Sequence, residues 1–297
     1  MKKGLFKAFG FMILIGIIYL VANIIVTFGF IVLVFIRNPE MISGNADIMF
    51  NELIQGISNY LLHIVIGANL LSLVFIALFF LARRDKFLYY CKFRKVKVSD
   101  ALIITALGGF VNLLFITLLS LISGLEALSQ TMDDYSELME PLLDSPFLIM
   151  FIAIAIAAPL FEEIIMRGII LNDFRKVTPV WLAIVIQAIA FGLMHFNVVQ
   201  SSYAAVLGIV LGVIYIKYNS IWMPILFHFS FNFTSLITDI ILGEDVSLLL
   251  IGVLGLLGSI IFVALAKINY KEEYYEDIVE TIIVKDDLEE VVNIGED

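Results

Sequence analysis

The fold of this chain is decided by residues 147–175, which read FLIMFIAIAIAAPLFEEIIMRGIILNDFR. The stretch is mostly apolar and is longer than the roughly 20 residues that a helix needs to cross a bilayer. It nevertheless carries Glu162, Glu163 and Arg167. Because an ionisable side chain costs about 3 kcal/mol or more at bilayer depth, such a cluster indicates a functional site inside the membrane.

The composition of the whole chain agrees with a membrane location. Of its 297 residues, 61% are hydrophobic and only 15% are charged, whereas a soluble domain has about 25% charged residues. Strand-like alternation typical of a membrane barrel is not seen. We therefore predict an all-α membrane protein, a polytopic bundle of about eight transmembrane helices. The predicted spans are 6–36, 58–82, 101–123, 147–175, 178–197, 201–217, 221–242 and 247–267.

The distribution of charge predicts orientation and domains. Basic residues gather before the first span and between Arg83 and Lys97, whereas the opposite loops hold Arg37 and many carboxylates. By the positive-inside rule, a multi-pass protein of the plasma membrane with both termini in the cytoplasm is expected. We divide the chain into an N-terminal two-helix region with a basic cytoplasmic loop (1–100), a bundle that carries the motifs (101–267) and an acidic cytoplasmic tail (268–297).

The net charge of −10 excludes one class of partner. Much of it comes from the tail, which has eleven Asp and Glu against three Lys when Lys267 is counted. An acidic protein is a poor ligand for a phosphate backbone, so nucleic-acid binding is not expected. The expected partners are the lipid bilayer and a membrane-associated peptide or protein substrate.

Three motifs carry the residues suited to chemistry: Glu162-Glu163-x-x-x-Arg167, Phe191-x-x-x-His195 and His228-x-x-x-Asn232. Side chains four apart share a helix face, so Glu163 and Arg167 can form an ion pair. Each residue turns about 100° around the helix axis, so Glu162 points elsewhere and is free to face a cavity. There it could act as a general base.

Two of the three histidines lie in motifs. His195 follows Phe191 by one turn, and His228 shares a face with Asn232. Together with Glu162 they could position a water for attack on a carbonyl group. Alternatively, Glu162, His195 and His228 could bind zinc with one open position. The motifs of known serine and HExxH-type intramembrane proteases are not found.

A straight-helix estimate of depth does not place these residues in one plane. Glu162 lies 13 residues before Arg175, or ~20 Å from the inner end of its span. His195 lies 17 residues after Thr178, or ~26 Å from the same side. His228 lies 7 residues after Ile221, only ~10 Å up. If the motifs converge, the helices must tilt or bend.

With these motifs in order inside apolar spans, the chain resembles the CPBP family of intramembrane proteases, which includes the CAAX prenyl endopeptidases and the bacterial Abi-type proteins. The resemblance covers about residues 147–240. It implies an eight-helix bundle with a buried site in which Glu162 activates the water, aided by His195. It implies also that His228 and Asn232 stabilise the oxyanion, and that Glu163, Arg167 and Phe191 are supporting residues.

The expected function is therefore that of an intramembrane endopeptidase, with either a metal-free glutamate mechanism or zinc. A second hypothesis is a non-catalytic membrane scaffold or bacteriocin-immunity protein that retains the motifs. A third is a proton- or ion-coupled transporter, since buried Glu and His also suit proton relays. Against the transporter, the chain shows no inverted repeat of broken helices.

Overall fold

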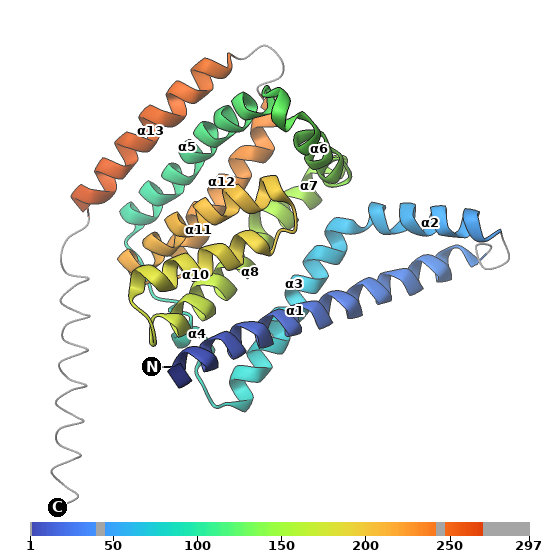
Figure 1. Ribbon diagram of the computed structural model, residues 1–297, viewed down its shortest axis with the longest axis horizontal. Helices are drawn as coiled ribbons and strands as arrows, with labels where there is room; N and C mark the ends of the chain where they lie inside the picture. Colours follow the sequence, from blue (N-terminus) through green and yellow to red (C-terminus); the bar gives the residue numbers. More distant parts are fainter. Residues whose placement is uncertain (1, 40–44, 242–246, 270–297) are drawn as a thin grey trace, which may run out of the picture.

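The computed structural model describes residues 2–39, 45–241 and 247–269, and the regular elements in these ranges are all helical (Figure 1). The first half comprises α1 (Lys2–Arg37), α2 (Ala46–Asn59), α3 (Leu61–Ala82), α4 (Phe87–Tyr90), α5 (Val98–Ser123), η2 (Glu126–Leu128) and α6 (Ser129–Leu143). The second half comprises α7 (Phe147–Met150), η3 (Phe151–Ala157), α8 (Ala158–Glu163), η4 (Ile164–Leu171), α9 (Asn172–Phe174), α10 (Val180–Leu193), α11 (Val198–Tyr218), α12 (Trp222–Ile241) and α13 (Leu248–Asn269).

Each of the eight predicted spans forms a helix or, between Phe147 and Phe174, a continuous series of helical segments. Six of them are long and apolar enough to cross a membrane. Among the described residues, α10 with 14 residues is shorter than these six, and α12 is not one of them. Helices α10 and α12 supply Phe191, His228 and Asn232. Large apolar side chains such as Leu20, Leu78 and Leu121 stay exposed on the long helices, as expected where lipid replaces water. The protein is a multi-pass helical membrane protein.

Four helical elements of the described chain lie wholly or mostly outside the predicted spans. They are α2 after the first span, α4 in the basic loop, and η2 and α6 in the acidic stretch between the third and fourth spans. Helix α6 has an apolar and a polar side, which suits a helix lying across the end of a bundle. Residues 270–297 of the predicted acidic tail lie outside the residues that the structure describes.

Four pairs of helices dominate the packing. Helix α5 packs most extensively with α13 and α12, α10 packs with α11, and α1 packs with α3 (Figure 1). The α10–α11 contact depends on the Gly208 and Gly212 pair. A Cβ atom added at Gly208 would lie 2.9 Å from the Cα of Ala188, and one at Gly212 would lie 2.9 Å from the Nε2 of Gln187. Small residues therefore let these two backbones approach closely, as the Gly-xxx-Gly spacing predicts.

Gly108 is the most demanding glycine on α5, and we expect Gly108→Ala to lower stability markedly. An added Cβ would overlap the backbone carbonyl oxygen of Phe227 on α12, which cannot move aside without shifting the helix. Overpacking of this kind costs about 1–3 kcal/mol. The measurement is the thermal unfolding midpoint of the purified variant in detergent.

Gly16→Ala is the matched control, because a Cβ there meets nothing within 4 Å. Its helix should be unchanged or more stable by up to about 1 kcal/mol, since alanine has the higher helix propensity. Equal stability of the two variants would contradict the close α5–α12 approach.

The fourth span is irregular. Its segments η3 and η4 are π-helical, and between them lies the short α-helix α8. Pro159 lies in the first turn of α8 and has no N–H to donate to the preceding turn. π-helical turns occur frequently at functional sites, and Glu162 and Glu163 lie at the junction of α8 and η4.

Candidate active site

The centre of the site is a buried cluster formed by Glu163, Arg167 and His228. The Arg167 Nη1 donates to Glu163 Oε1 at 2.8 Å, and both side chains are 0% exposed. The same Glu163 oxygen lies 2.8 Å from Nδ1 of His228, so that ring nitrogen donates to the carboxylate. The predicted Glu163–Arg167 ion pair is thus present, and it is joined to a second motif through His228.

Arg167 contacts residues of three helices. Besides Glu163, its Nη2 donates to the backbone oxygen of Gly208 on α11 at 3.3 Å. Its guanidinium carbon lies 4.6 Å from the ring centroid of Phe191 on α10, a cation–π geometry. Gln187 donates to the same Gly208 oxygen at 2.8 Å. Arg167 therefore connects the span that carries the carboxylates to the α10–α11 pair.

Glu162 takes a different position from its neighbour. Its side chain is 15% exposed, whereas Glu163 is fully buried. The Oε2 of Glu162 lies 3.8 Å from Nε2 of His228, a separation too long for a hydrogen bond. A water molecule commonly bridges polar atoms at such distances. Glu163 thus orients the imidazole through Nδ1, and the other ring nitrogen, Nε2, lies on the side of Glu162.

The structure brings together two residues that the straight-helix estimate of depth had separated. Glu162 and His228, whose estimated heights differ by about 10 Å at 1.5 Å per residue, lie side by side. The fourth span is not a straight α-helix, since its π-helical turns contain more residues for the same length of helix. Helices α8 and α12 also pack directly against one another.

Phe191 links His195 to the cluster. Its ring contacts the His195 ring at 5.1 Å and the His228 ring at 5.9 Å between centroids, both edge to face. His195 lies just beyond the end of α10, and its Nδ1 donates to the backbone oxygen of Phe191 at 2.9 Å. Among the described residues, no hydrogen bond or ion pair joins His195 to Glu162. The bond to Phe191 leaves Nε2 of His195 free for a ligand.

Asn232 is placed one turn beyond His228 and is only partly buried. Its Nδ2 donates to the backbone oxygen of Ile154 in η3 at 2.8 Å. An amide nitrogen carries two hydrogens, so one N–H remains for another acceptor. Asn232 therefore fixes the π-helical segment of the fourth span while keeping one donor.

A cavity of about 610 Å³ opens beside Asn232. It lies under helix α6, and Ile154, Tyr203 and Phe231 line it together with Asn232 and Asp133. An adjoining groove of about 530 Å³ is almost wholly apolar and shares Tyr203 and Phe231 with it. The first cavity thus ends one helical turn from His228, and the groove connects it to the apolar surface between α5 and α11.

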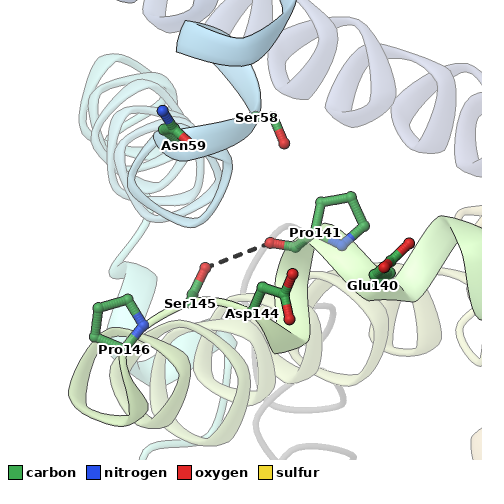
Figure 2. A pocket seen from close by; sticks show the side chains of 7 residues that line it. All are labelled: Ser58, Asn59, Glu140, Pro141, Asp144, Ser145 and Pro146. Carbon is green, nitrogen blue, oxygen red and sulfur yellow. Dashed lines mark hydrogen bonds between the residues drawn. The ribbon is translucent and has the colours of Figure 1, made fainter.

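Another cavity, of about 300 Å³, lies between the end of α2 and the C-terminal end of α6 (Figure 2). Figure 2 shows Glu140 and Asp144 on one side and Ser58 and Asn59 on the other. None of the motif residues lines this cavity, so it is separate from the candidate site.

The arrangement of the side chains does not fit the predicted three-ligand zinc site. In the described ranges, no group of three or more His, Cys, Asp or Glu side chains is close enough to hold a metal ion. Glu162 and His228 approach one another, whereas the ring contact of His195 is with Phe191, which also contacts His228.

Sequence reasoning overlooked two polar residues near the motifs. Gln187 is fully buried and bonds to the Gly208 oxygen that also accepts from Arg167. Tyr203 lines both the cavity and the groove. A polar side chain within an apolar span is the signal that could have identified Gln187, whereas nothing in the sequence distinguishes Tyr203 from other interfacial tyrosines.

Comparison with known proteins supports the resemblance inferred from the motifs. Residues 144–234 match the family described as Rce1-like, type II CAAX prenyl endopeptidase Rce1-like. The matched residues include all three motifs, so the resemblance inferred from these motifs is confirmed over this region.

One curated relative is similar over a shorter length. It is a Bacillus subtilis (strain 168) protein named "Putative membrane peptidase YdiL", 30% identical over 84 residues. The alignment covers 28% of this chain and 34% of the relative. This chain thus spans about a third of that relative's length. No solved structure of another protein matches this chain.

Proposed function

We propose that this protein is an intramembrane endopeptidase that hydrolyses a peptide bond with a water activated by Glu162. The observation that carries the proposal is the arrangement of Glu162 and His228. One oxygen of Glu162 lies 3.8 Å from Nε2 of His228, and the carboxylate of Glu163, itself paired with Arg167, binds Nδ1 of the same imidazole. The match of residues 144–234 to a family of endopeptidases supports the same reading.

In the proposed mechanism, Glu162 accepts a proton from a water hydrogen-bonded between its carboxylate and His228. The water oxygen attacks the carbonyl carbon of the peptide, and the carbonyl oxygen becomes an oxyanion. Glu162 then gives the proton to the leaving nitrogen as the C–N bond breaks. A positioned general base of this kind contributes about 10²–10⁴-fold to the rate.

Asn232 and His228 are proposed to stabilise the oxyanion. The second N–H of Asn232 is not used by the Ile154 carbonyl, and it lies beside the cavity. His228 adds a second donor when its Nε2 is protonated. Loss of one such donor typically costs about 10²–10³-fold in rate. His195, held through its Nδ1, is proposed to contact the water or the substrate with its free Nε2.

The cavities indicate the class of substrate. The apolar groove between α5, α6 and α11 suits a membrane-embedded segment, and the cavity under α6 provides hydroxyl, amide and carboxylate groups for a polar peptide segment. We therefore propose a membrane-associated peptide or protein substrate that enters sideways from the bilayer. Both termini are proposed to lie in the cytoplasm, because the basic residues lie on their side.

The proposal is tested by comparing the N- and C-termini of membrane proteins in cells that carry the wild type or Glu162→Gln at equal abundance. A small set of termini that depends on Glu162 supports proteolysis and identifies the substrate. Identical termini, together with an unchanged phenotype, would instead favour a non-catalytic scaffold or immunity protein.

A second prediction concerns metal. We expect the purified active protein to retain its activity after exhaustive chelation, because Glu162, His195 and His228 do not gather into a three-ligand site. The zinc content is measured by elemental analysis alongside the activity. Stoichiometric zinc that is lost, with activity, in His195→Ala would contradict this prediction and establish the ligand role.

A further inference from the structure

Three cations lie in two connections near the beginning of α1 (Figure 1). Lys92 and Arg94 follow α4, and Arg175 follows α9. The ammonium of Lys92 lies over the Tyr215 ring, and Asn172 of α9 donates to the hydroxyl of the same tyrosine at 2.6 Å, so the segments that carry Lys92 and Arg175 meet at Tyr215. Among the described residues, no ion pair joins Lys92, Arg94 or Arg175 to a carboxylate.

The nearest carboxylate in the sequence is already engaged. Asp173 forms an ion pair with Lys176 at 2.8 Å and accepts a hydrogen bond from the Tyr90 hydroxyl. The cation cluster therefore has only neutral partners within the described chain. Lys92 donates to the Asn219 side-chain oxygen, and its ammonium lies 5.4 Å from the centroid of the Tyr215 ring.

Burial makes this cluster unlike an ordinary basic loop. Lys92 and Arg175 are both partly buried. Burial, and then the neighbouring Arg175 and Arg94, lower the pKa of Lys92 to about 7. Exposed basic residues of a cytoplasmic loop would instead separate in solvent, where repulsion is weak.

The backbone holds the cluster in place. The N–H of Ile221 donates to the oxygen of Lys92 at 3.0 Å, and the Ser220 hydroxyl donates to the oxygen of Arg94 at 2.7 Å. Lys92 and Asn219 both have a positive φ, of 58° and 49°. Such a conformation in a residue other than glycine is maintained only by its surroundings. The fold thus fixes like charges near one another, a cost that a bound anion would remove.

We infer that Lys92, Arg94 and Arg175 form a binding site for a phosphate-type anion, presented by the headgroup of an anionic phospholipid or by free phosphate. Two guanidinium groups can each donate two parallel hydrogen bonds to phosphate oxygens, and Lys92 adds a point charge. The position at a membrane-protein end where basic residues gather suits the headgroup of a lipid. This site is independent of the proposed protease function.

The test uses the full chain in nanodiscs and the fluorescence of Trp222, whose ring contacts Phe93 between Lys92 and Arg94 at 5.4 Å between centroids. Sodium phosphate is titrated into phosphatidylcholine nanodiscs at constant ionic strength. In parallel, nanodiscs with phosphatidylglycerol are used, and lipid retained after detergent exchange is measured by mass spectrometry. The variants are Lys92→Gln and Arg175→Gln, with the exposed Lys95→Gln as the matched control.

We expect both variants to weaken anion binding by about tenfold or more, because each removes a charged hydrogen-bond donor. Lys95→Gln should change the affinity by less than twofold. Saturable phosphate binding in phosphatidylcholine assigns the site to a free anion. Selective retention of phosphatidylglycerol without phosphate binding assigns it to the lipid headgroup. Either result supports the anion site if Lys92→Gln and Arg175→Gln lose that binding.

Two results would overturn the inference: no response to either anion in the wild type, or equal responses in the wild type and in both variants. The thermal stability of each variant, measured without anion, shows whether a variant that does not bind is still folded. Lys92→Gln should leave it unchanged or raise it, since a buried charge beside two guanidiniums is removed. If Lys92→Gln fails to fold, anion binding by Arg175→Gln decides the question.

Discussion

Glu162→Gln is expected to reduce proteolysis by about 10²–10⁴-fold, the contribution of a positioned general base. Glutamine has nearly the same shape as glutamate but cannot accept the proton of the attacking water at neutral pH. The side chain of Glu162 is not part of the Glu163–Arg167 ion pair. The variant should therefore insert and fold like the wild type. The measurement is the rate of cleavage of an identified substrate by purified protein in lipid.

Glu52→Gln is the matched control, because it makes the same chemical change at an exposed position on α2. It should cleave the substrate at the wild-type rate. If Glu162→Gln were folded and equally active, the assignment of Glu162 as general base would be wrong. If it were inactive because it had lost thermal stability, Glu162 would be a structural residue.

Arg167→Ala is expected to be the most destabilising single substitution in the cluster. Both partners of the Glu163–Arg167 pair are fully buried, so removal of the guanidinium leaves a carboxylate without its cation. Breaking a buried pair in this way costs about 3–5 kcal/mol. The contacts of Arg167 to the Gly208 oxygen and to the Phe191 ring are lost as well. Both yield and activity should fall.

The effect is measured as the unfolding midpoint of the purified variant and as its abundance in the membrane. Arg83→Ala serves as the control, since the Arg83–Asp85 pair is half exposed and a surface pair contributes about 1 kcal/mol or less. The double variant Glu163→Gln, Arg167→Met should recover much of the lost stability, because no uncompensated charge remains. Normal stability of Arg167→Ala would contradict the role of Arg167 as the link between η4, α10 and α11.

Glu162→Gln and Arg167→Ala also distinguish the group that contacts the water from the groups that position His228. Glu162 is the group that meets the water in the proposed mechanism, whereas Glu163 and Arg167 position His228. A substitution of Glu162 should lower the rate of cleavage and leave the fold intact. A substitution of Glu163 or Arg167 should lower both the rate and the stability, and a conservative replacement there should restore the fold before it restores the rate.

Much of the fold could be predicted from the sequence. Apolar runs of bilayer length fix the number and approximate bounds of the spans, because an unpaired backbone group inside lipid costs several kcal/mol and only a helix satisfies every group locally. The pairing of Glu163 with Arg167 follows from their spacing on one helix. The Gly208 and Gly212 spacing likewise predicts the close α10–α11 contact.

What could not be predicted from the sequence are the relations between helices. Straight helices place Glu162 and His228 at different depths, and only the π-helical turns of the fourth span and its packing on α12 bring them within 3.8 Å. The acidic stretch before that span forms helix α6, whose position over the cavity depends on the tertiary packing. The Asn232 bond to Ile154 and the hydrogen bonds that hold the backbone of Lys92 and Arg94 are likewise contacts between distant segments.

The sequence by itself determined the residue types, their order and their burial in a membrane, since these follow from local helix geometry and the cost of charge in lipid. The tertiary structure decided which nitrogen of His228 each carboxylate meets, with Glu163 at Nδ1 and Glu162 near Nε2. That choice depends on helix tilt and on the irregular turns of the fourth span. Both are set by long-range packing, to which the local spacing of residues is insensitive.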